Sequence, residues 1–136
     1  KTIASVKSSL DLLKIEYIDL IQVHDPEFCS DNFVQIIVET LPALDELRKQ
    51  GKVRYIGING YPMHIYEELL RRSNVEINTI LTYARLTPIN NDFLVERKNL
   101  NEKNLLQKVG VINAAATAMG LLTPGSKVMC DWHPAN

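Results

Sequence analysis

The sequence predicts an α/β protein in which about four βα units form a parallel sheet. Short apolar segments begin near residues 17, 53, 79 and 109, and segments with helical periodicity lie between them. Intervals of this length are typical of βα units with right-handed crossovers. Two architectures fit the pattern: an open doubly wound sheet, or part of a (β/α)8 TIM barrel. No GxGxxG motif or P-loop is present, so the usual phosphate cradle of open sheets is missing.

The spacing of apolar residues predicts the first helix and the first strand. Apolar residues of segment 2–13 recur three or four positions apart and form one stripe of an amphipathic helix. Tyr17 to Asp25 is then typical of a parallel strand that is buried on both faces. The strand ends at His24 and Asp25, followed by Pro26, so an imidazole and a carboxylate come at its carboxyl end. Parallel α/β sheets carry their chemistry at that end.

A helical segment over residues 33–49 follows, and a proline interrupts it. Pro42 has no backbone N–H to donate to the preceding turn, so we expect a break or a kink there. A second helix should then begin at Thr40 or Leu41, with the proline in its first turn. Gly51 is the expected C′ residue that ends this helix.

The second half of the chain alternates strands and helices in the same way. We expect strands at 53–58, 77–83 and 109–115, a helix that starts at Tyr61, and a polar, irregular helical stretch over 91–106. A complete barrel needs about 250 residues, so four βα units are about half of one. The chain starts with Lys1 rather than Met, and we expect it to be a piece of a longer protein.

Composition argues against several classes of function. The 136 residues carry a formal net charge of −1 and no basic block, which gives no electrostatic case for nucleic acid binding. No apolar run approaches the length of a membrane span, and no signal peptide opens the chain. Cys29 and Cys130 lie far apart without a CxxC spacing, so we expect two reduced thiols, no disulfide between them, and a cytoplasmic protein.

His24 is the first candidate for chemistry because it follows a buried strand. Its alternative role is structural, as a strand-end histidine whose imidazole is satisfied by a backbone carbonyl. Together with Asp25, Glu27 and Cys29 it also resembles a metal-ligand set, but the spacing matches no recognised site and we expect no metal. We expect His64 on a solvent-facing turn of a helix.

Three motifs carry a resemblance to the aldo-keto reductase family. They are Tyr17-Ile18-Asp19-Leu20 with Val23-His24-Asp25, then Gly51-Lys52-Val53-Arg54-Tyr55-Ile56-Gly57, and Gly120-Leu121-Leu122-Thr123. More narrowly, the segments 24–28, 39–44, 118–123 and 131–135 resemble the L-galactose dehydrogenase-like branch, which includes aldose 1-dehydrogenases. The resemblance spans nearly the whole chain.

The resemblance implies a (β/α)8 barrel that transfers hydride between a nicotinamide cofactor, NAD or NADP, and a sugar C1 hydroxyl or a carbonyl substrate. Residues 1–136 would be a partial barrel that lacks the N-terminal and C-terminal units. Of the family's Tyr, Lys, Asp and His, only the His is matched, at His24, where it would hydrogen-bond the substrate oxygen. The implied cofactor-binding residues are Asn59, Gly60, Thr82, Ala115, Thr117 and Met119.

Two departures from the family pattern concern the nicotinamide site. Many members have Ser-Asn where this chain has Asn59-Gly60; Asn59 still offers a donor and an acceptor, but Gly60 offers no side chain. A ring-stacking aromatic residue at the end of the seventh barrel strand is replaced near Ala114, and the sugar-dehydrogenase branch also has a small residue there.

Two functions from different classes follow from these observations. The first is an NAD(P)-dependent sugar or carbonyl oxidoreductase, represented here by its middle units. The second is a non-catalytic (βα)4 fragment or an interaction module. If the chain is made alone, its two sheet edges would expose unpaired backbone groups, and its inner face would expose apolar side chains. We therefore expect self-association through those edges.

Overall fold

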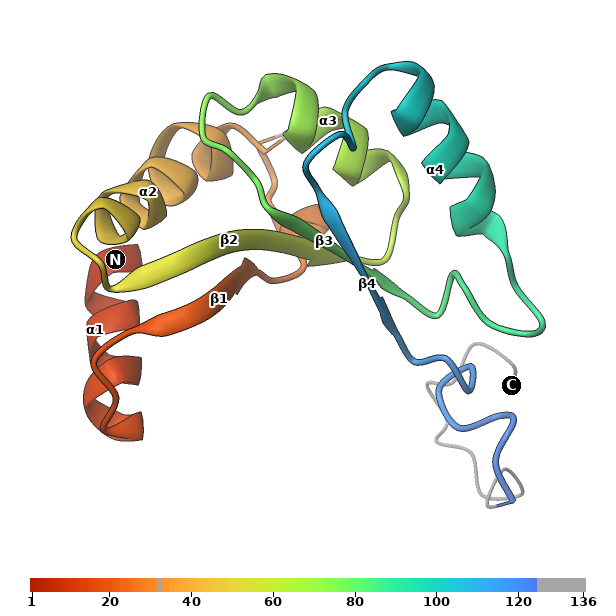
Figure 1. Cartoon of the computed structure of the whole chain (residues 1–136), viewed down its shortest axis with the longest axis horizontal. Helices are drawn as coiled ribbons and strands as arrows, with labels where there is room; N and C mark the ends of the chain where they lie inside the picture. The colour runs from red at the N-terminus through yellow and green to blue at the C-terminus, as the bar shows by residue number, and fades with distance from the viewer. Residues whose placement is uncertain (32, 125–136) are drawn as a thin grey trace.

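Four parallel strands form the centre of the structure, a computed structural model that describes residues 1–31 and 33–124 (Figure 1). The strands are β1 (Ile18–Val23), β2 (Val53–Gly60), β3 (Thr79–Tyr83) and β4 (Gly110–Ala114), and they lie side by side in sequence order. Each neighbouring pair is parallel, which confirms the predicted arrangement of βα units. The carboxyl ends of all four strands therefore lie at the same edge of the sheet.

Helical segments connect the strands. They are α1 (Thr2–Leu13), the 3-10 turn η1 (Pro26–Phe28), the π-helical turn η2 (Ile36–Thr40), α2 (Leu41–Lys49), α3 (His64–Arg72) and α4 (Asp92–Glu102). Figure 1 shows α2, α3 and α4 along one face of the sheet, with α1 next to the edge strand β1. The stretch expected to be irregular, residues 91–106, is a regular α-helix over most of its length.

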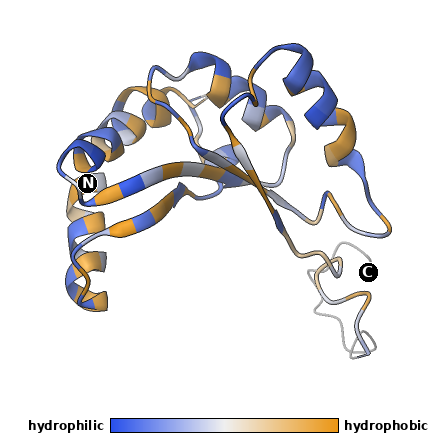
Figure 2. Ribbon diagram, in the orientation of Figure 1, coloured by the Kyte–Doolittle hydropathy of each residue, from blue (hydrophilic) through white to orange (hydrophobic). Residues whose placement is uncertain are grey.

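The strand register divides the sheet into a helix-covered face and an open face. Ile58 pairs with Val23 on one side and Ile80 on the other, and Ile58 and Ile80 have no exposed surface. Side chains alternate along a strand, so Tyr55 and Tyr83 point to the opposite face, where they are 43% and 39% exposed. Figure 2 shows hydrophobic residues along the strands and in patches on the helices.

The hydrophobic core lies between the helices and the covered face of the sheet. Its most deeply buried side chains come from both layers: Leu41, Leu47, Val53, Ile56, Ile58, Ile65, Tyr66, Leu69, Ile80, Phe93 and Leu100. Each fully buried side chain of this size contributes about 1.5–3 kcal/mol relative to exposure. The helix-covered face is therefore the main source of hydrophobic stabilisation in the described part of the chain.

Pro42 lies where a π-helical turn changes to an α-helix, so the second helix begins at Leu41 as predicted, but the expected break is absent because the helical run continues from residue 34 to residue 49. The N–H of Leu41 donates to the carbonyl of Ile36, five residues earlier, which is the hydrogen bond of a π-helix. The α-helix α2 then begins at Leu41, with Pro42 in its first turn. Because Pro42 has no N–H and its ring crowds the preceding turn, the change from π to α geometry falls at the proline.

Gly51 ends α2 in a Schellman motif and leads directly into the next strand. Its φ is 71°, and its N–H donates to the carbonyl of Arg48 at 3.0 Å. The N–H of Lys52 donates to the carbonyl of Leu47 at 2.9 Å, which completes the motif. This confirms the predicted C′ glycine.

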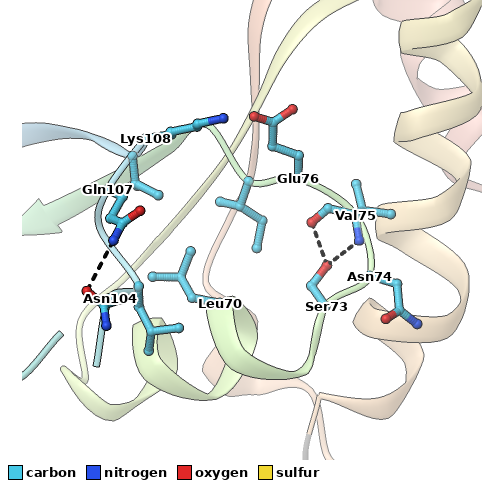
Figure 3. A pocket seen from close by; sticks show the side chains of 11 residues that line it. Leu70, Ser73, Asn74, Val75, Glu76, Asn104, Gln107 and Lys108 are labelled. Carbon is cyan, nitrogen blue, oxygen red and sulfur yellow. Dashed lines mark hydrogen bonds between the residues drawn. The ribbon is translucent and has the colours of Figure 1, made fainter. Parts of the chain in front are cut away.

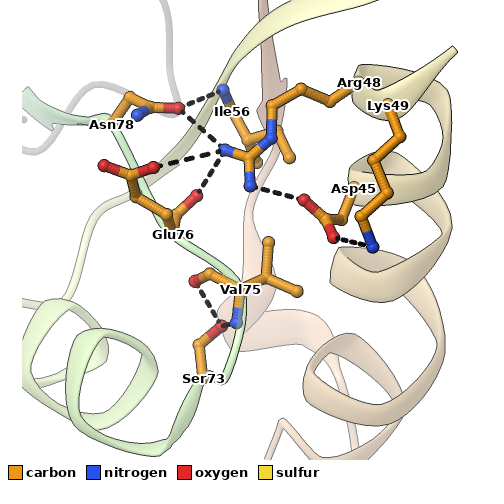
Figure 4. Close-up of polar contacts among 8 residues, drawn as sticks. All are labelled: Asp45, Arg48, Lys49, Ile56, Ser73, Val75, Glu76 and Asn78. Atoms are coloured by element: carbon orange, nitrogen blue, oxygen red, sulfur yellow. Dashed lines mark hydrogen bonds and ion pairs between the residues drawn. The ribbon is translucent and has the colours of Figure 1, made fainter.

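A polar cluster fastens the amino ends of the strands (Figure 4). The Asn78 N–H donates to the Ile56 carbonyl at 2.7 Å, and Asn78 Oδ1 accepts from the Ile56 N–H at 2.9 Å. The Asn78 carbonyl accepts from the N–H of Gly110 at 2.8 Å. Arg48 of α2 donates to the carbonyl of Glu76 at 3.2 Å. Asn78 thus links β2, β3 and β4, and Arg48 joins α2 to the same loop.

Several other expectations concern single residues. Cys29 is a free thiol that donates to Asp31 at 2.8 Å, and this hydrogen bond raises the pKa of the thiol. Cys130 and the motif at 131–135 lie outside the described residues.

Over residues 1–31 and 33–124, no helix is long and apolar enough to cross a membrane. The same ranges hold no group of three or more His, Cys, Asp or Glu side chains that could bind a metal ion.

We expect Asn78→Ala to lower the free energy of unfolding by about 1–3 kcal/mol, because the Ile56 N–H would lose its side-chain acceptor. Urea denaturation followed by circular dichroism measures this change. The matched control is Asn74→Ala, at an exposed asparagine of the same loop, which should change the value by less than about 0.5 kcal/mol. Equal losses in the two variants would contradict the structural role of Asn78.

Candidate active site

A pocket of about 460 Å³ opens at the carboxyl ends of the strands. Its lining comes from the last residues of the strands or from residues just after them: His24, Asp25, Asn59, Gly60, Tyr61, Leu81, Tyr83 and Ala114. Asn59 pairs with Leu81, and Tyr83 pairs with Ala114, so the lining comes from two successive rows of the register on the open face. Because parallel sheets carry their chemistry at this edge, the pocket is the candidate active site.

His24 directly follows β1, and its side chain is 74% exposed. Its Nδ1 atom lies 3.0 Å from Oδ2 of Asp25. An ionised carboxylate only accepts hydrogen bonds, so Nδ1 is the donor in this pair. The partner of the imidazole is therefore a side-chain carboxylate, and the alternative of a backbone carbonyl partner is not what the structure shows.

The side chain of Asn59 connects β2 to the turn after β1. Its Oδ1 atom accepts from the Asp25 N–H at 3.2 Å, and its Nδ2 atom lies 3.5 Å from Oε1 of Gln22. Asp25 has a left-handed backbone with φ of 46°, which Asp adopts more readily than most residues. Asn59 thereby holds the strand end that presents His24, and its amide retains one N–H and one lone pair for a ligand.

Tyr66 of α3 holds the ends of β2 and β3 together on the helix-covered face. Its hydroxyl oxygen lies 2.9 Å from the carbonyl oxygen of Gly60 and 2.8 Å from that of Leu81. The side chain has no exposed surface, and burial raises the pKa of the hydroxyl to about 12. One buried O–H is therefore shared between two strand ends that both line the pocket.

Gly60 is a position where a side chain has no room. A Cβ there would collide with Ile65 of α3 and with the carboxylate of Glu27. Oε1 of Glu27 accepts from the Tyr61 N–H at 2.8 Å, which ties η1 to the end of β2. The missing side chain at Gly60 permits this close approach of two elements to the strand end.

Aromatic side chains from two strand ends line the pocket. The guanidinium of Arg85 lies 4.0 Å from the centre of the Tyr61 ring, and Arg85 also pairs with Asp92 at 3.0 Å. Tyr83 is opposite Ala114 in the register. The small residue at position 114 therefore stands next to an aromatic ring on the neighbouring strand.

The structure divides the predicted cofactor-binding residues into three groups. Asn59 and Gly60 line the pocket. Thr82 is fully buried, pairs with Gly60, and faces the helices because its neighbours Leu81 and Tyr83 face the pocket. The other three lie in the loop after β4 and outside the lining: Ala115, Thr117 and Met119.

Two residues that shape the pocket have only weak signals in the sequence. Tyr66 falls among the apolar residues of α3, so nothing in the periodicity marks its hydroxyl as a link between strands. Glu27 stands close after the first strand, but its partner, the Tyr61 N–H, comes from another strand end. Only the parallel packing of β1 and β2 brings these groups together.

A second pocket, of about 420 Å³, lies between the end of α3 and the loop before β4 (Figure 3). Its one hydroxyl, on Ser73, donates to the carbonyl of Val75 at 2.9 Å and accepts from the Val75 N–H at 3.0 Å. Both functions of the hydroxyl are engaged in a local turn. In this pocket, at the amino ends of β3 and β4, the hydroxyl of Ser73 is therefore not free to act as a nucleophile.

Comparison with known proteins agrees with the motifs in the sequence. The profile of the Aldo/keto reductase family matches residues 1–134. The chain belongs to the aldo/keto reductase family. Among aldo/keto reductase relatives, L-galactose dehydrogenase of Arabidopsis thaliana is 38% identical over 133 residues, which are 97% of this chain and 39% of that protein. D-arabinose 1-dehydrogenase of Saccharomyces cerevisiae is 30% identical over 138 residues, with coverage of 97% and 39%.

Solved aldo/keto reductase structures show the same arrangement of strands and helices. The aldo-keto reductase AKR11C1 from Bacillus halodurans, in its holo form, superposes with a TM-score of 0.63 at 30% identity. The match covers 90% of this chain and 38% of that one. The chain thus spans about two-fifths of the length of the relatives it matches, and its four parallel strands are part of a (β/α)8 barrel.

We expect Tyr66→Phe to lower stability and to flatten its dependence on alkaline pH. The pKa of this hydroxyl is raised from 10 to about 12 in the folded state, so its contribution is complete below pH 10 and is lost as the pH rises to 12. Each pKa unit corresponds to about 1.4 kcal/mol. Urea denaturation at pH 8 to 12 measures the effect, and a variant with the wild-type alkaline slope would contradict it. Tyr17→Phe, at a half-exposed tyrosine, is the control.

Proposed function

We propose that this chain is the central part of an NAD(P)-dependent aldo/keto reductase that transfers hydride between the nicotinamide and a sugar C1 hydroxyl or a carbonyl substrate. The observation that carries the proposal is the pocket at the carboxyl ends of the strands, where His24 and Asn59 lie among apolar and aromatic side chains. Two relatives, L-galactose dehydrogenase and D-arabinose 1-dehydrogenase, favour an aldose as the substrate.

The residues of the pocket fit a nicotinamide group. Leu81 and Ala114 supply apolar surface for a flat ring, and Tyr83 supplies an aromatic one. The free N–H and lone pair of Asn59 suit a carboxamide, which needs both a donor and an acceptor. When bound, an oxidised nicotinamide would take the hydride from C1, so that the sugar becomes a lactone once its hydroxyl proton is removed.

His24 is the residue we propose to contact the reacting oxygen. Its exposed imidazole stands at the strand end beside Asn59, where it can hydrogen-bond and orient the oxygen of the substrate. None of the 5 tyrosines of the chain matches the family's proton-transfer motif. We therefore propose that the base is supplied by a segment outside residues 1–136.

In the longer enzyme, we expect His24→Ala to lower kcat/KM for aldose oxidation by about 10²-fold, because the group that orients the substrate oxygen is lost. Absorbance of the reduced nicotinamide measures the rate. His64→Ala is the matched control, at an exposed histidine of α3 that contacts Phe33 and lies outside the pocket, and it should keep the wild-type rate. A change of less than about threefold in His24→Ala would show a structural histidine.

The 136-residue chain alone should show no turnover, because loss of the proton-transfer group typically costs about 10²–10⁴-fold. We also expect it to associate, because β1 and β4 are the outer strands of the described sheet and leave backbone groups unpaired at its edges. Nicotinamide absorbance and sedimentation velocity measure the two properties. Turnover above background, or a single monomeric species with a cooperative melt, would contradict this expectation.

A further inference from the structure

We propose that Gln22 is a positioning residue, which orients the amide of Asn59 toward the carboxamide of a bound nicotinamide. This inference rests on the proposed function and deepens it, because it names the residue that sets how the site recognises that carboxamide. Gln22 lies outside the lining of the pocket, so it acts on the cofactor only through Asn59.

Two contacts set the direction of the Asn59 amide. The backbone N–H of Asp25 can only donate, so the oxygen Oδ1 of Asn59 faces it, at 3.2 Å. The nitrogen Nδ2 lies on the other side, 3.5 Å from Oε1 of Gln22. If the amide were turned over, Nδ2 would face the Asp25 N–H and Oδ1 would face Oε1, and neither pair can form a hydrogen bond. Both neighbours therefore select the same orientation.

The register places Gln22 one row from Asn59 on the open face of the sheet. Gln22 pairs with Gly57, which is two residues before Asn59 on β2, so the three positions share a face. A Cβ at Gly57 would lie 3.1 Å from Cγ of Gln22 and would collide with Oγ1 of Thr79. The missing side chain at Gly57 thus leaves room for the side chain of Gln22 to reach across β2 to the amide of Asn59.

The two ends of the Gln22 amide differ in what they contact. Oε1 faces Asn59, whereas Nε2 is buried and forms no hydrogen bond with the described residues of the chain. A buried N–H without an acceptor lowers stability. The fold therefore gains little from an amide at this position, and an apolar residue of similar size should be tolerated. A change in cofactor binding would then report on the orientation of Asn59.

A nicotinamide carboxamide is sensitive to this orientation, because its oxygen accepts and its NH₂ group donates. After its contacts with Asp25 and Gln22, the Asn59 amide has one N–H for the carboxamide oxygen and one lone pair for the NH₂ group. In the 3-acetylpyridine analogue of the cofactor, a methyl group replaces the NH₂ group, so the contact with the lone pair is lost. The preference for the carboxamide over this analogue therefore measures how well Asn59 is oriented.

The test measures the Kd of the longer enzyme for NAD⁺ or NADP⁺, whichever binds more tightly, and for its 3-acetylpyridine analogue. Both compounds carry the same pyridinium charge, so the ratio of the two Kd values cancels the electrostatic effect of a substitution. We expect Gln22→Leu to lower this preference ratio by about threefold to tenfold, the range for one hydrogen bond. Gln22→Glu keeps an acceptor for Asn59 Nδ2 and should retain the wild-type ratio. Added to Asn59→Ala, Gln22→Leu should cause no further change, because Gln22 acts through Asn59.

The matched control is Gln50→Leu, which removes the amide of an exposed glutamine just after α2, where Nε2 donates to Glu46 at 2.8 Å. It should keep the wild-type preference ratio. A wild-type ratio near one, an unchanged ratio in Gln22→Leu, a ratio in Gln22→Glu as low as in Gln22→Leu, or a further loss in the Asn59→Ala background would each overturn the proposal.

A spectroscopic measurement without cofactor separates this inference from the proposed function. The ¹⁵N relaxation of the Asn59 side-chain amide should show an ordered group in the wild type and in Gln50→Leu, and a mobile group in Gln22→Leu. If no nicotinamide dinucleotide binds but the mobility differs in this way, the proposed function fails and the positioning role of Gln22 stands. An Asn59 amide that is as ordered in Gln22→Leu as in the wild type would overturn the inference whatever the cofactor affinity.

Discussion

The parallel register of β1, β2 and β3 is the constraint on which the rest of the structure depends. It places Val23, Ile58 and Ile80 in one row that faces the helices, and it brings the carboxyl ends of the strands to one edge. A slip of one residue in β2 would turn Ile58 to the open face and Asn59 toward the helices. The same register therefore decides where the core forms and which polar side chains reach the pocket.

The two ends of the sheet use polar groups in different ways. At the amino ends, the amide oxygen, the backbone N–H and the backbone carbonyl of Asn78 all form hydrogen bonds with neighbouring strands. These groups stabilise the sheet and are not free to bind a ligand. At the carboxyl ends, the buried hydroxyl of Tyr66 and the amide of Asn59 hold the strand ends, while His24 stays exposed. Stability at one end and chemistry at the other is the division expected of a βα barrel.

Local chemistry made much of the fold predictable, and the tertiary contacts explain the rest. Pro42 and Gly51 act within a few residues of themselves, so their effects on α2 could be read from the sequence. The polar segment 91–106 was expected to be irregular, but Phe93 and Leu100 bury one side of α4 and keep it helical. At the site, the place of His24 could be predicted because parallel α/β sheets carry their chemistry at the carboxyl ends of the strands. The burial of Thr82 depends on the strand register, and the hydrogen bonds of Tyr66 depend on the packing of α3, so neither could be predicted from the sequence.

A crystal structure of the longer enzyme with an oxidised nicotinamide cofactor and an aldose is the most direct test of the central claim, that the reaction takes place in the pocket at the carboxyl ends of the strands. We expect the C1 oxygen of the sugar to lie within about 3 Å of His24 Nε2, in the pocket that Asn59 and Tyr83 line. A sugar bound at the amino ends of the strands, or C1 placed away from the imidazole, would contradict it.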